Sequence, residues 1–227
     1  MLNKDKPQTY TLAKLQMYDE CPQKYKLCYI DKVHVVEKIQ TQKASKTGTN
    51  IHNLVNFYFK GMDVTKLVES LSQPEKLLWH NFKNSELQGL NYVDSEYSFN
   101  VRIGGYWMTG RIDALFESNG DYIILDWKTG ETFSPESVKF QTTFYLVCMY
   151  EILKAKNYIK EPKQLSLYYM DLNAGSLVKI HFDEELYTNY KAQILEIINK
   201  INNNPSFYCN KTDKCKQCKY YRACPYL

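Results

Sequence analysis

The sequence predicts an α/β fold in which helices cover a central mixed sheet. Three strand-like segments follow one another between residues 92 and 126, with helical segments before and after them. A further strand segment, 165–170, comes after the next helix. Elements in this order bury their apolar sides when the strands form one sheet and the helices pack on its faces.

The N-terminal part of the chain is predicted to be mainly helical. Residues 11–30 have the pattern of a helix that is interrupted at Pro22. The polar segment 31–47 is expected to be a loop, and 48–60 is an amphipathic helix. One or two further helices are expected within 63–90.

The middle of the chain changes to strands. Residues 92–103 and 106–117 flank Gly104-Gly105, which is typical of a two-residue hairpin turn. Asn119-Gly120 then leads into the short apolar strand 122–126. The C-terminal part is expected to contain a helix, two strands and a long last helix that Pro205 stops, at 136–156, 165–170, 177–182 and 184–203.

Length and composition indicate one globular domain over 1–227. Hydrophobic residues make up 44% and charged residues 24%, which excludes a disordered chain and a simple coiled coil. The net charge of +4 comes from 29 basic and 25 acidic residues. Five of the basic residues and one acid lie in 209–227, so the rest of the chain is neutral by count. We therefore do not expect a diffuse basic surface.

The sequence also suggests a compartment. No stretch approaches the roughly 20 apolar residues that span a bilayer, and the start of the chain lacks an apolar run of signal-peptide type. We expect a cytoplasmic protein without a membrane partner. Clustered cysteines in such a protein bind metal more often than they form disulfides.

Two acidic residues are predicted to meet on neighbouring strands. Asp126 and Lys128 end the apolar strand and share a face, because side chains alternate along a strand. Asp113, in Gly110-Arg111-Ile112-Asp113, comes beside them. Close carboxylates stay ionised most easily around a divalent cation such as Mg²⁺ or Mn²⁺, which activates water and offsets phosphodiester charge. The alternative is a pair of solvated turn residues.

Helical side chains are candidates for the same site. His52 follows Gly48 by one helical turn, and a neutral imidazole is a good third metal ligand, although a lone histidine is often only hydrogen-bonded in a core. Gln141 and Tyr145 are four residues apart and point the same way. They are suited to position Lys128 or to contact nucleic acid, or they form an ordinary helix face.

The series Gly48-x-x-x-His52, Gly110-Arg111-Ile112-Asp113, Asp126-Trp127-Lys128-Thr129-Gly130 and Gln141-x-x-x-Tyr145 resembles the RecB-type nucleases of the PD-(D/E)XK superfamily. The resemblance implies a restriction-endonuclease-like core over 48–170. It also implies that a divalent ion is bound by His52, Asp113 and Asp126, and that Lys128 is catalytic with Gln141 and Tyr145 as an auxiliary motif. Glu96 matches a further acidic position of some members.

The tail 205–227 holds a compact group of cysteines, Cys215-x-x-Cys218 and Cys224. A tetrahedral metal or an iron–sulfur cluster takes four thiolates. Cys209 would complete a local zinc knuckle, whereas Cys21, after the first helix, would tie the two ends of the chain together. The residues by themselves leave both quartets open.

The same layout resembles the iron–sulfur subgroup of these nucleases, including AddB and the CRISPR-associated RecB-like exonucleases. There, one upstream cysteine and three C-terminal cysteines hold a [4Fe-4S] cluster. The resemblance implies the ligands Cys21, Cys215, Cys218 and Cys224 and a structural cluster.

The predicted function is therefore that of a Mg²⁺- or Mn²⁺-dependent deoxyribonuclease. We expect an exonuclease that acts on single-stranded DNA or DNA ends in repair and recombination, phage replication or CRISPR adaptation, with a helicase or a CRISPR integrase as a possible partner. The alternative is a DNA-binding or assembly module of the same fold without turnover, which would not need Asp113, Asp126 and Lys128 together.

Overall fold

The structure is a computed structural model that describes residues 9–35, 39–130, 133–203 and 206–226. Within these residues one mixed sheet contains six strands, in which β1 is parallel to β3 and β4 to β5, and the other pairs are antiparallel. The strands are β1 (Thr9–Tyr10), β2 (Asn91–Ile103), β3 (Tyr106–Ser118), β4 (Asp121–Lys128), β5 (Leu165–Asp171) and β6 (Ser176–His181). The predicted α/β fold with a mixed central sheet flanked by helices is confirmed.

Two tight hairpins build the centre of the sheet. Gly104 and Gly105 have φ values of 56° and 92°, and Asn119 and Gly120 have 54° and 86°. Positive φ at both central residues gives a turn whose twist matches that of the flanking strands. The hairpin turns predicted at these two dipeptides are therefore confirmed.

The strand β3 has an edge that is only partly covered. β2 pairs along one edge of β3, whereas β1 and β4 share the other. On that shared edge β1 pairs with Trp107 and Met108, and β4 pairs with residues 114–118. Within the described part of the chain, residues 109–113 therefore face an opening between β1 and β4.

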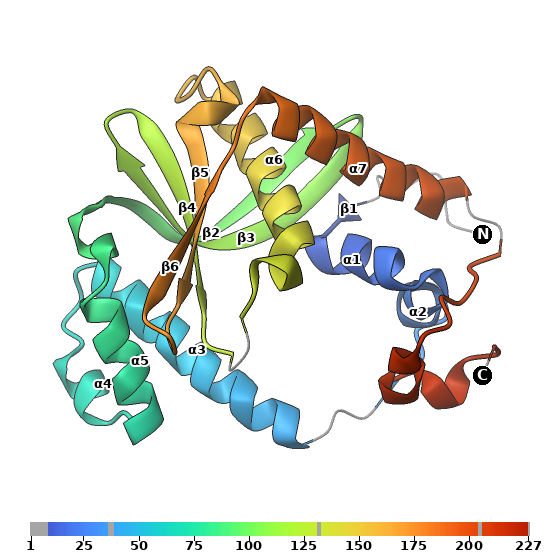
Figure 1. Cartoon of the computed structure of the whole chain (residues 1–227), viewed down its shortest axis with the longest axis horizontal. Coiled ribbons are helices and arrows are strands. Elements are labelled where there is room, and N and C mark those ends of the chain that lie inside the picture. The colour runs from blue at the N-terminus through green and yellow to red at the C-terminus, as the bar shows by residue number, and fades with distance from the viewer. Residues whose placement is uncertain (1–8, 36–38, 131–132, 204–205, 227) are drawn as a thin grey trace.

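Helices cover both faces of the sheet (Figure 1). On one face, α1 (Leu12–Glu20), α6 (Lys139–Ala155) and α7 (Glu184–Asn203) bury Leu15, Phe144 and Ile194 against strand residues such as Ile112. On the other face, α3 (Ile39–Phe59) and α5 (Gln73–Lys83) pack against the sheet next to the short α4 (Thr65–Glu69). Two apolar cores, one on each side, hold the sheet in place.

The N-terminal helix breaks where the sequence predicts it. Thr11 caps α1 by accepting a hydrogen bond from the Lys14 N–H at 3.2 Å, and Cys21 is extended. Pro22 then begins the short α2 (Pro22–Tyr25), which continues as a π-helical turn over Lys26–Ile30. Proline suits the first position of a helix because its missing N–H has no partner there.

The prediction of a loop over 31–47 is wrong from residue 39 onward, because α3 begins at Ile39. Residues 39–47 include two Gln, two Lys and one Ala, which have high helix propensity, and the segment needs no apolar stripe to extend a helix that is anchored further on. The two-residue strand β1 is too short to have given a pattern. Pro205, predicted to stop the last helix, lies outside the described residues, and α7 ends at Asn203.

Gly48 lets α3 approach the end of β4 closely. A Cβ atom at this position would lie 2.9 Å from the Thr129 Oγ1 atom. This close approach brings the following helical turn, with His52, to the strand end.

The two ends of the chain meet. The Gln23 N–H donates to the Tyr208 carbonyl at 3.0 Å, and the Asn210 Nδ2 donates to the Glu20 carbonyl at 2.9 Å. Figure 1 shows the C-terminal turns, over Asp213–Gln217 and Tyr221–Ala223, next to α2. Among the described helices, none is long and apolar enough to cross a membrane.

Candidate active site

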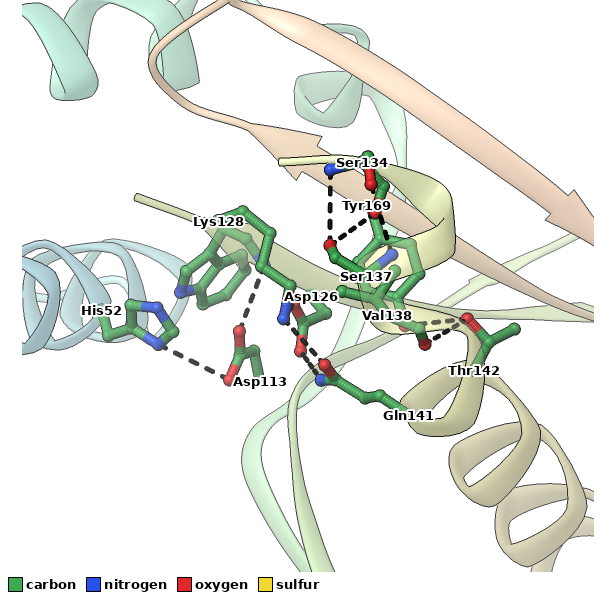
Figure 2. A network of polar contacts seen from close by, with 11 residues as sticks. His52, Asp113, Asp126, Lys128, Ser134, Ser137, Val138, Gln141, Thr142 and Tyr169 are labelled. Atoms are coloured by element: carbon green, nitrogen blue, oxygen red, sulfur yellow. Dashed lines mark hydrogen bonds and ion pairs between the residues drawn. The ribbon is translucent and has the colours of Figure 1, made fainter. Parts of the chain in front are cut away.

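Lys128, Asp126 and Gln141 form a closed ring of polar contacts at the end of β4 (Figure 2). The Lys128 Nζ lies 2.6 Å from Asp126 Oδ2 and donates to Gln141 Oε1 at 2.9 Å. The Gln141 Nε2 in turn donates to Asp126 Oδ1 at 2.5 Å. Because α6 begins beside the end of β4, Gln141 holds both the Lys128 ammonium and the Asp126 carboxylate in fixed positions.

The Asp126 carboxylate is almost fully buried. Burial, followed by the negative charge of Asp113, raises its pKa, whereas the Lys128 ammonium acts in the opposite direction. A buried carboxylate keeps its charge only when a cation or hydrogen bonds compensate the lost hydration. The ionised form of Asp126 therefore depends on nearby positive charge, from Lys128 or from a bound cation.

Asp113 links this ring to α3. Its Oδ2 accepts a hydrogen bond from the Trp127 N–H at 3.1 Å, and its Oδ1 lies 3.5 Å from the His52 Nδ1. Burial lowers the pKa of His52, but the hydrogen bond and the charge of Asp113, together with Asp126 and Glu96, outweigh burial and raise it. The imidazole thus sits in a strongly negative environment.

Glu96 completes a group of three possible ligands. Its backbone has φ +53°, a left-handed conformation that is costly for a residue with a side chain. One candidate ligand atom each from His52, Glu96 and Asp113 lies within 4.8 Å of the other two. The Arg111 Nη1 lies 2.7 Å from Glu96 Oε2. Strained backbone of this kind is found where structure serves a site.

The donor set fits a divalent cation. Two carboxylates and one imidazole suit Mn²⁺ or Mg²⁺, which prefer oxygen ligands. Of the predicted ligands, His52 and Asp113 are in this group, whereas both oxygens of Asp126 contact Lys128 and Gln141. The third place in the group belongs to Glu96.

The sequence contained a signal for Glu96. Glu96 lies eight residues before Gly104, and Asp113 lies eight residues after Gly105, so the hairpin places them opposite one another. In the structure, the neighbours pair accordingly, Ser95 with Ala114 and Tyr97 with Ile112. The register of the hairpin therefore identifies Glu96 once Asp113 is chosen.

Tyr145 stands one helical turn beyond Gln141. Burial is the main cause that raises the pKa of its phenol, and the charges of Asp126 and Asp113 add to it, whereas the Gln141 side chain lowers it. The structure thus brings all six predicted residues together, namely His52, Asp113, Asp126, Lys128, Gln141 and Tyr145. A residue that the sequence did not suggest is Tyr169 on β5, whose ring centre lies 5.3 Å from the Lys128 Nζ.

The sequence profile of the PD-(D/E)XK nuclease superfamily matches residues 72–225. The chain belongs to this superfamily. The part of the nuclease that matches contains Glu96, Asp113, Asp126, Lys128 and the C-terminal cysteines, whereas His52 and Cys21 precede it.

Two solved structures are similar to this chain. A structure described as that of a candidate exonuclease from Eubacterium rectale superposes with a TM-score of 0.55 at 12% identity, over 96% of this chain and 88% of that chain. The structure of SSO0001 gives a TM-score of 0.49 at 15% identity, over 99% and 89% of the two chains. At 12% identity, the likeness to the Eubacterium rectale protein shows a shared fold. No curated protein sequence matches the chain.

The nuclease has a second cluster of reactive side chains where the two ends of the chain meet. A cavity of about 810 Å³ lies between α2 and the tail. Five of the seven cysteines line it, all as free thiols: Cys21, Cys209, Cys215, Cys218 and Cys224. Cys148 is instead buried in the core, as expected of a core thiol.

Cys209 is the member of this cluster that the predicted quartet leaves out. The hydrogen bonds of its two neighbours, Tyr208 and Asn210, hold it next to Cys21. Burial, together with the nearby thiols of Cys21 and Cys224, raises the pKa of Cys209 to about 12. The geometry therefore places both candidate fourth ligands, Cys21 and Cys209, beside the C-terminal cysteines 215, 218 and 224.

The spacing of the thiols bears on the type of metal. Zinc holds each thiolate at about 2.3 Å, so the sulfurs of a zinc site lie roughly 4 Å apart. In the part of the chain that the structure describes, no three cysteine sulfurs lie within 4.8 Å of one another. The thiols are thus not gathered at the spacing of a closed zinc site.

Proposed function

We propose that this protein is a divalent-metal-dependent deoxyribonuclease. One observation carries the proposal: His52, Glu96 and Asp113 converge beside the Lys128–Asp126–Gln141 ring in a chain of a nuclease superfamily. A binding module would have no need for a positioned lysine next to a set of metal ligands.

The residues take distinct roles in this proposal. His52, Glu96 and Asp113 would hold Mg²⁺ or Mn²⁺. Asp126 would be a further ligand, because its carboxylate and that of Asp113 repel one another and a cation between them would relieve this repulsion. The cation would supply an activated water and offset charge on the phosphodiester. Lys128 orients the attacking water or stabilises the negative charge that develops on the phosphate.

The proposal is tested on labelled single-stranded DNA with Mn²⁺ or Mg²⁺. We expect the wild type to degrade the strand, Lys128→Ala to be inactive, and EDTA to stop the reaction. Lys163→Ala serves as the matched control, because this lysine pairs with Glu161 on the surface and its side chain is 75% exposed. If the wild type degrades no DNA with any divalent cation, the enzyme proposal fails.

We further propose that the enzyme is an exonuclease acting on single strands or DNA ends. Linear and circular single-stranded DNA of the same sequence distinguish the two modes of cleavage. An exonuclease degrades the linear strand and leaves the circle intact, and 5′- or 3′-blocked strands give the polarity. Binding of both substrates without cleavage would favour the non-catalytic DNA-binding or assembly module.

The cysteine cavity is proposed to hold a structural [4Fe-4S] cluster on Cys21, Cys215, Cys218 and Cys224. Support comes from the shared cavity, which cysteines from both ends of the chain line. Metal binding by residues from both ends of a chain contributes directly to folding. Docking on a helicase or a CRISPR integrase stays a prediction, which co-purification with such a partner would test.

A further inference from the structure

A surface groove of about 450 Å³ opens beside the active site. It lies between the first turns of α1 and the part of β3 that pairs with neither β1 nor β4. Arg111 lines the groove and contacts Glu96 of the candidate metal group. Tyr145 also lines the groove and lies one turn of α6 beyond Gln141. The groove is therefore continuous with the active site.

The lining of the groove has the chemistry of a phosphate-binding surface. Besides Arg111 and Tyr145 it includes Gln16, Ser98 and Thr109. Arg, Ser, Thr, Gln and Tyr side chains are among the groups that contact the DNA backbone in protein complexes. Among the described residues that line the groove, none carries a carboxylate, although three carboxylates lie just beyond it at the active site.

Arg111 is placed to reach a phosphate in this groove. Its side chain is 64% exposed, and the contact with Glu96 occupies one end of a guanidinium that has five N–H donors. Arg111 and Asp113 are two residues apart on the same strand, about 7 Å along it. A DNA strand whose cleaved phosphate lies at Asp113 would thus have its neighbouring phosphate near Arg111.

The distribution of charge favours local contacts of this kind over a diffuse basic surface. The chain outside its tail is neutral by count, and it has only three arginines. Arg102 donates to the Gly105 carbonyl in a hairpin turn, and Arg222 lies in the tail. Affinity for a polyanion must therefore come from a few well-placed groups, because each phosphate that is neutralised contributes to binding.

We propose that this groove binds the phosphodiester backbone of the DNA strand next to the cleaved bond, with Arg111 on the neighbouring phosphate. The proposal rests on the proposed nuclease function and adds the path of the strand, between α1 and the open edge of β3. A phosphate held there fixes the register of the strand relative to Lys128 without reading its sequence.

Gln16 provides the cleanest test, because it lines the groove from α1, whereas Arg111 also contacts a candidate metal ligand. We would measure binding of labelled single-stranded DNA by fluorescence anisotropy over a series of salt concentrations, with Ca²⁺ in place of Mg²⁺. Gln16→Lys is expected to tighten binding several-fold and to steepen the slope of log K against log salt by about 0.7, the value for one phosphate contact. Gln16→Glu is expected to weaken binding by a similar factor.

Gln193→Lys and Gln193→Glu are the matched controls. Gln193 lies on α7 and does not line the groove, so the same charge changes there are expected to leave affinity and slope within error of the wild type. Arg111→Gln is expected to weaken binding and to flatten the slope by about 0.7. Arg111→Lys, which keeps the charge, should restore most of the slope.

The outcomes separate this proposal from the function on which it rests. If the wild type cleaves DNA but the Gln16 and Arg111 variants bind with unchanged affinity and slope, the groove proposal is overturned and the nuclease function stands. If Arg111→Gln lowers Mn²⁺ affinity only, Arg111 acts through Glu96 and the groove proposal is also overturned. A wild type that neither binds nor cleaves DNA would instead refute the nuclease function.

Discussion

The Lys128 ammonium lies 2.6 Å from the Asp126 carboxylate at the end of β4. The two residues share a face of the strand because side chains alternate along it. Residues 123–127 of this strand are buried, so the pair sits where an apolar interior meets the active site. A charge pair in this position is costly to break, and it keeps the lysine at one place beside the candidate metal ligands.

Replacing Lys128 with methionine is expected to separate catalysis from stability. The variant loses the group that acts on the water or the phosphate, so cleavage should fall at least about 100-fold. It also leaves Asp126 buried without its cation, which should lower the free energy of unfolding by about 1–3 kcal/mol. Initial rates with Mn²⁺ and urea denaturation measure the two effects.

The double variant Lys128→Met with Asp126→Asn is the control for that experiment. Removing both charges should restore much of the lost stability, because no unpaired charge remains, while cleavage stays absent. A single variant that is as stable as the wild type would show that the ion pair contributes little to folding.

Glu96→Gln is expected to weaken metal binding. The change keeps the size and the strained backbone position of the side chain but removes one anionic ligand, and affinity for hard cations follows ligand charge. We expect the Mn²⁺ affinity, measured by calorimetry, to fall on the order of tenfold or more. Glu86→Gln removes a carboxylate that pairs with Lys179 on the surface and should leave the affinity unchanged. Equal affinities in all three proteins would remove Glu96 from the site.

Gly48→Ala tests the close approach of α3 to β4. In an exposed helix this change stabilises by about 1 kcal/mol, because alanine is the better helix former. Here the new Cβ would lie 2.9 Å from Thr129 Oγ1, so α3 or Thr129 must move. We therefore expect thermal denaturation to show no gain in stability, and activity to fall as His52 shifts. Adding Thr129→Ala should recover the gain; a stabilised single variant would contradict this account.

The choice between Cys21 and Cys209 as fourth ligand is open to a direct test. After purification without oxygen, Cys21→Ser should lose the brown colour, the iron and the sulfide of the protein, whereas Cys209→Ser should keep them. Because the cluster would join both ends of the chain, Cys21→Ser should also melt at a lower temperature. The reverse result would assign the local quartet with Cys209, and a colourless wild type that contains zinc would exclude the cluster.

The pairing of α6 with α7 predicts a dependence of stability on pH. Burial raises the pKa of Glu151, but hydrogen bonds from Lys191 and Tyr187 outweigh it and hold the pKa below its ordinary value of 4.5. A lowered pKa stabilises the fold above about pH 4.5, and this contribution is lost as the pH falls through the folded-state pKa. Glu151→Gln should therefore cost about 1–2 kcal/mol at pH 7 and much less at pH 3 in urea denaturation.

Glu196→Gln is the control for this prediction. Glu196 pairs with Lys200 on the surface of the same helix, α7, and its side chain is 63% exposed. Because exposed pairs contribute little, the variant should match the wild type at both pH values. A Glu151→Gln variant with the same deficit at pH 7 and pH 3 would show that shape, and not charge, matters at this contact.

Local patterns in the sequence predicted most of the fold. Both hairpin turns follow from pairs of Gly or Asn residues, and the strands on either side have bounds within two residues of those expected, because side-chain alternation and turn residues are local signals. The extension of α3 back to Ile39 was missed because a polar helix has no apolar stripe. The candidate active-site residues were predicted from motifs that resemble those of RecB-type nucleases, and the structure brings these residues together.

Only the tertiary structure decided how these residues share their contacts. The sequence placed Asp126 with His52 and Asp113, yet burial at the end of β4 and the start of α6 nearby join it to Lys128 and Gln141. The hairpin register that the sequence indicates puts Glu96 opposite Asp113, but only the structure shows that Glu96 joins the group, and its strained backbone has no signature in composition. The same holds for Cys209 and Cys21, which are neighbours only because the tail folds back onto α2, a long-range contact that motif spacing does not specify.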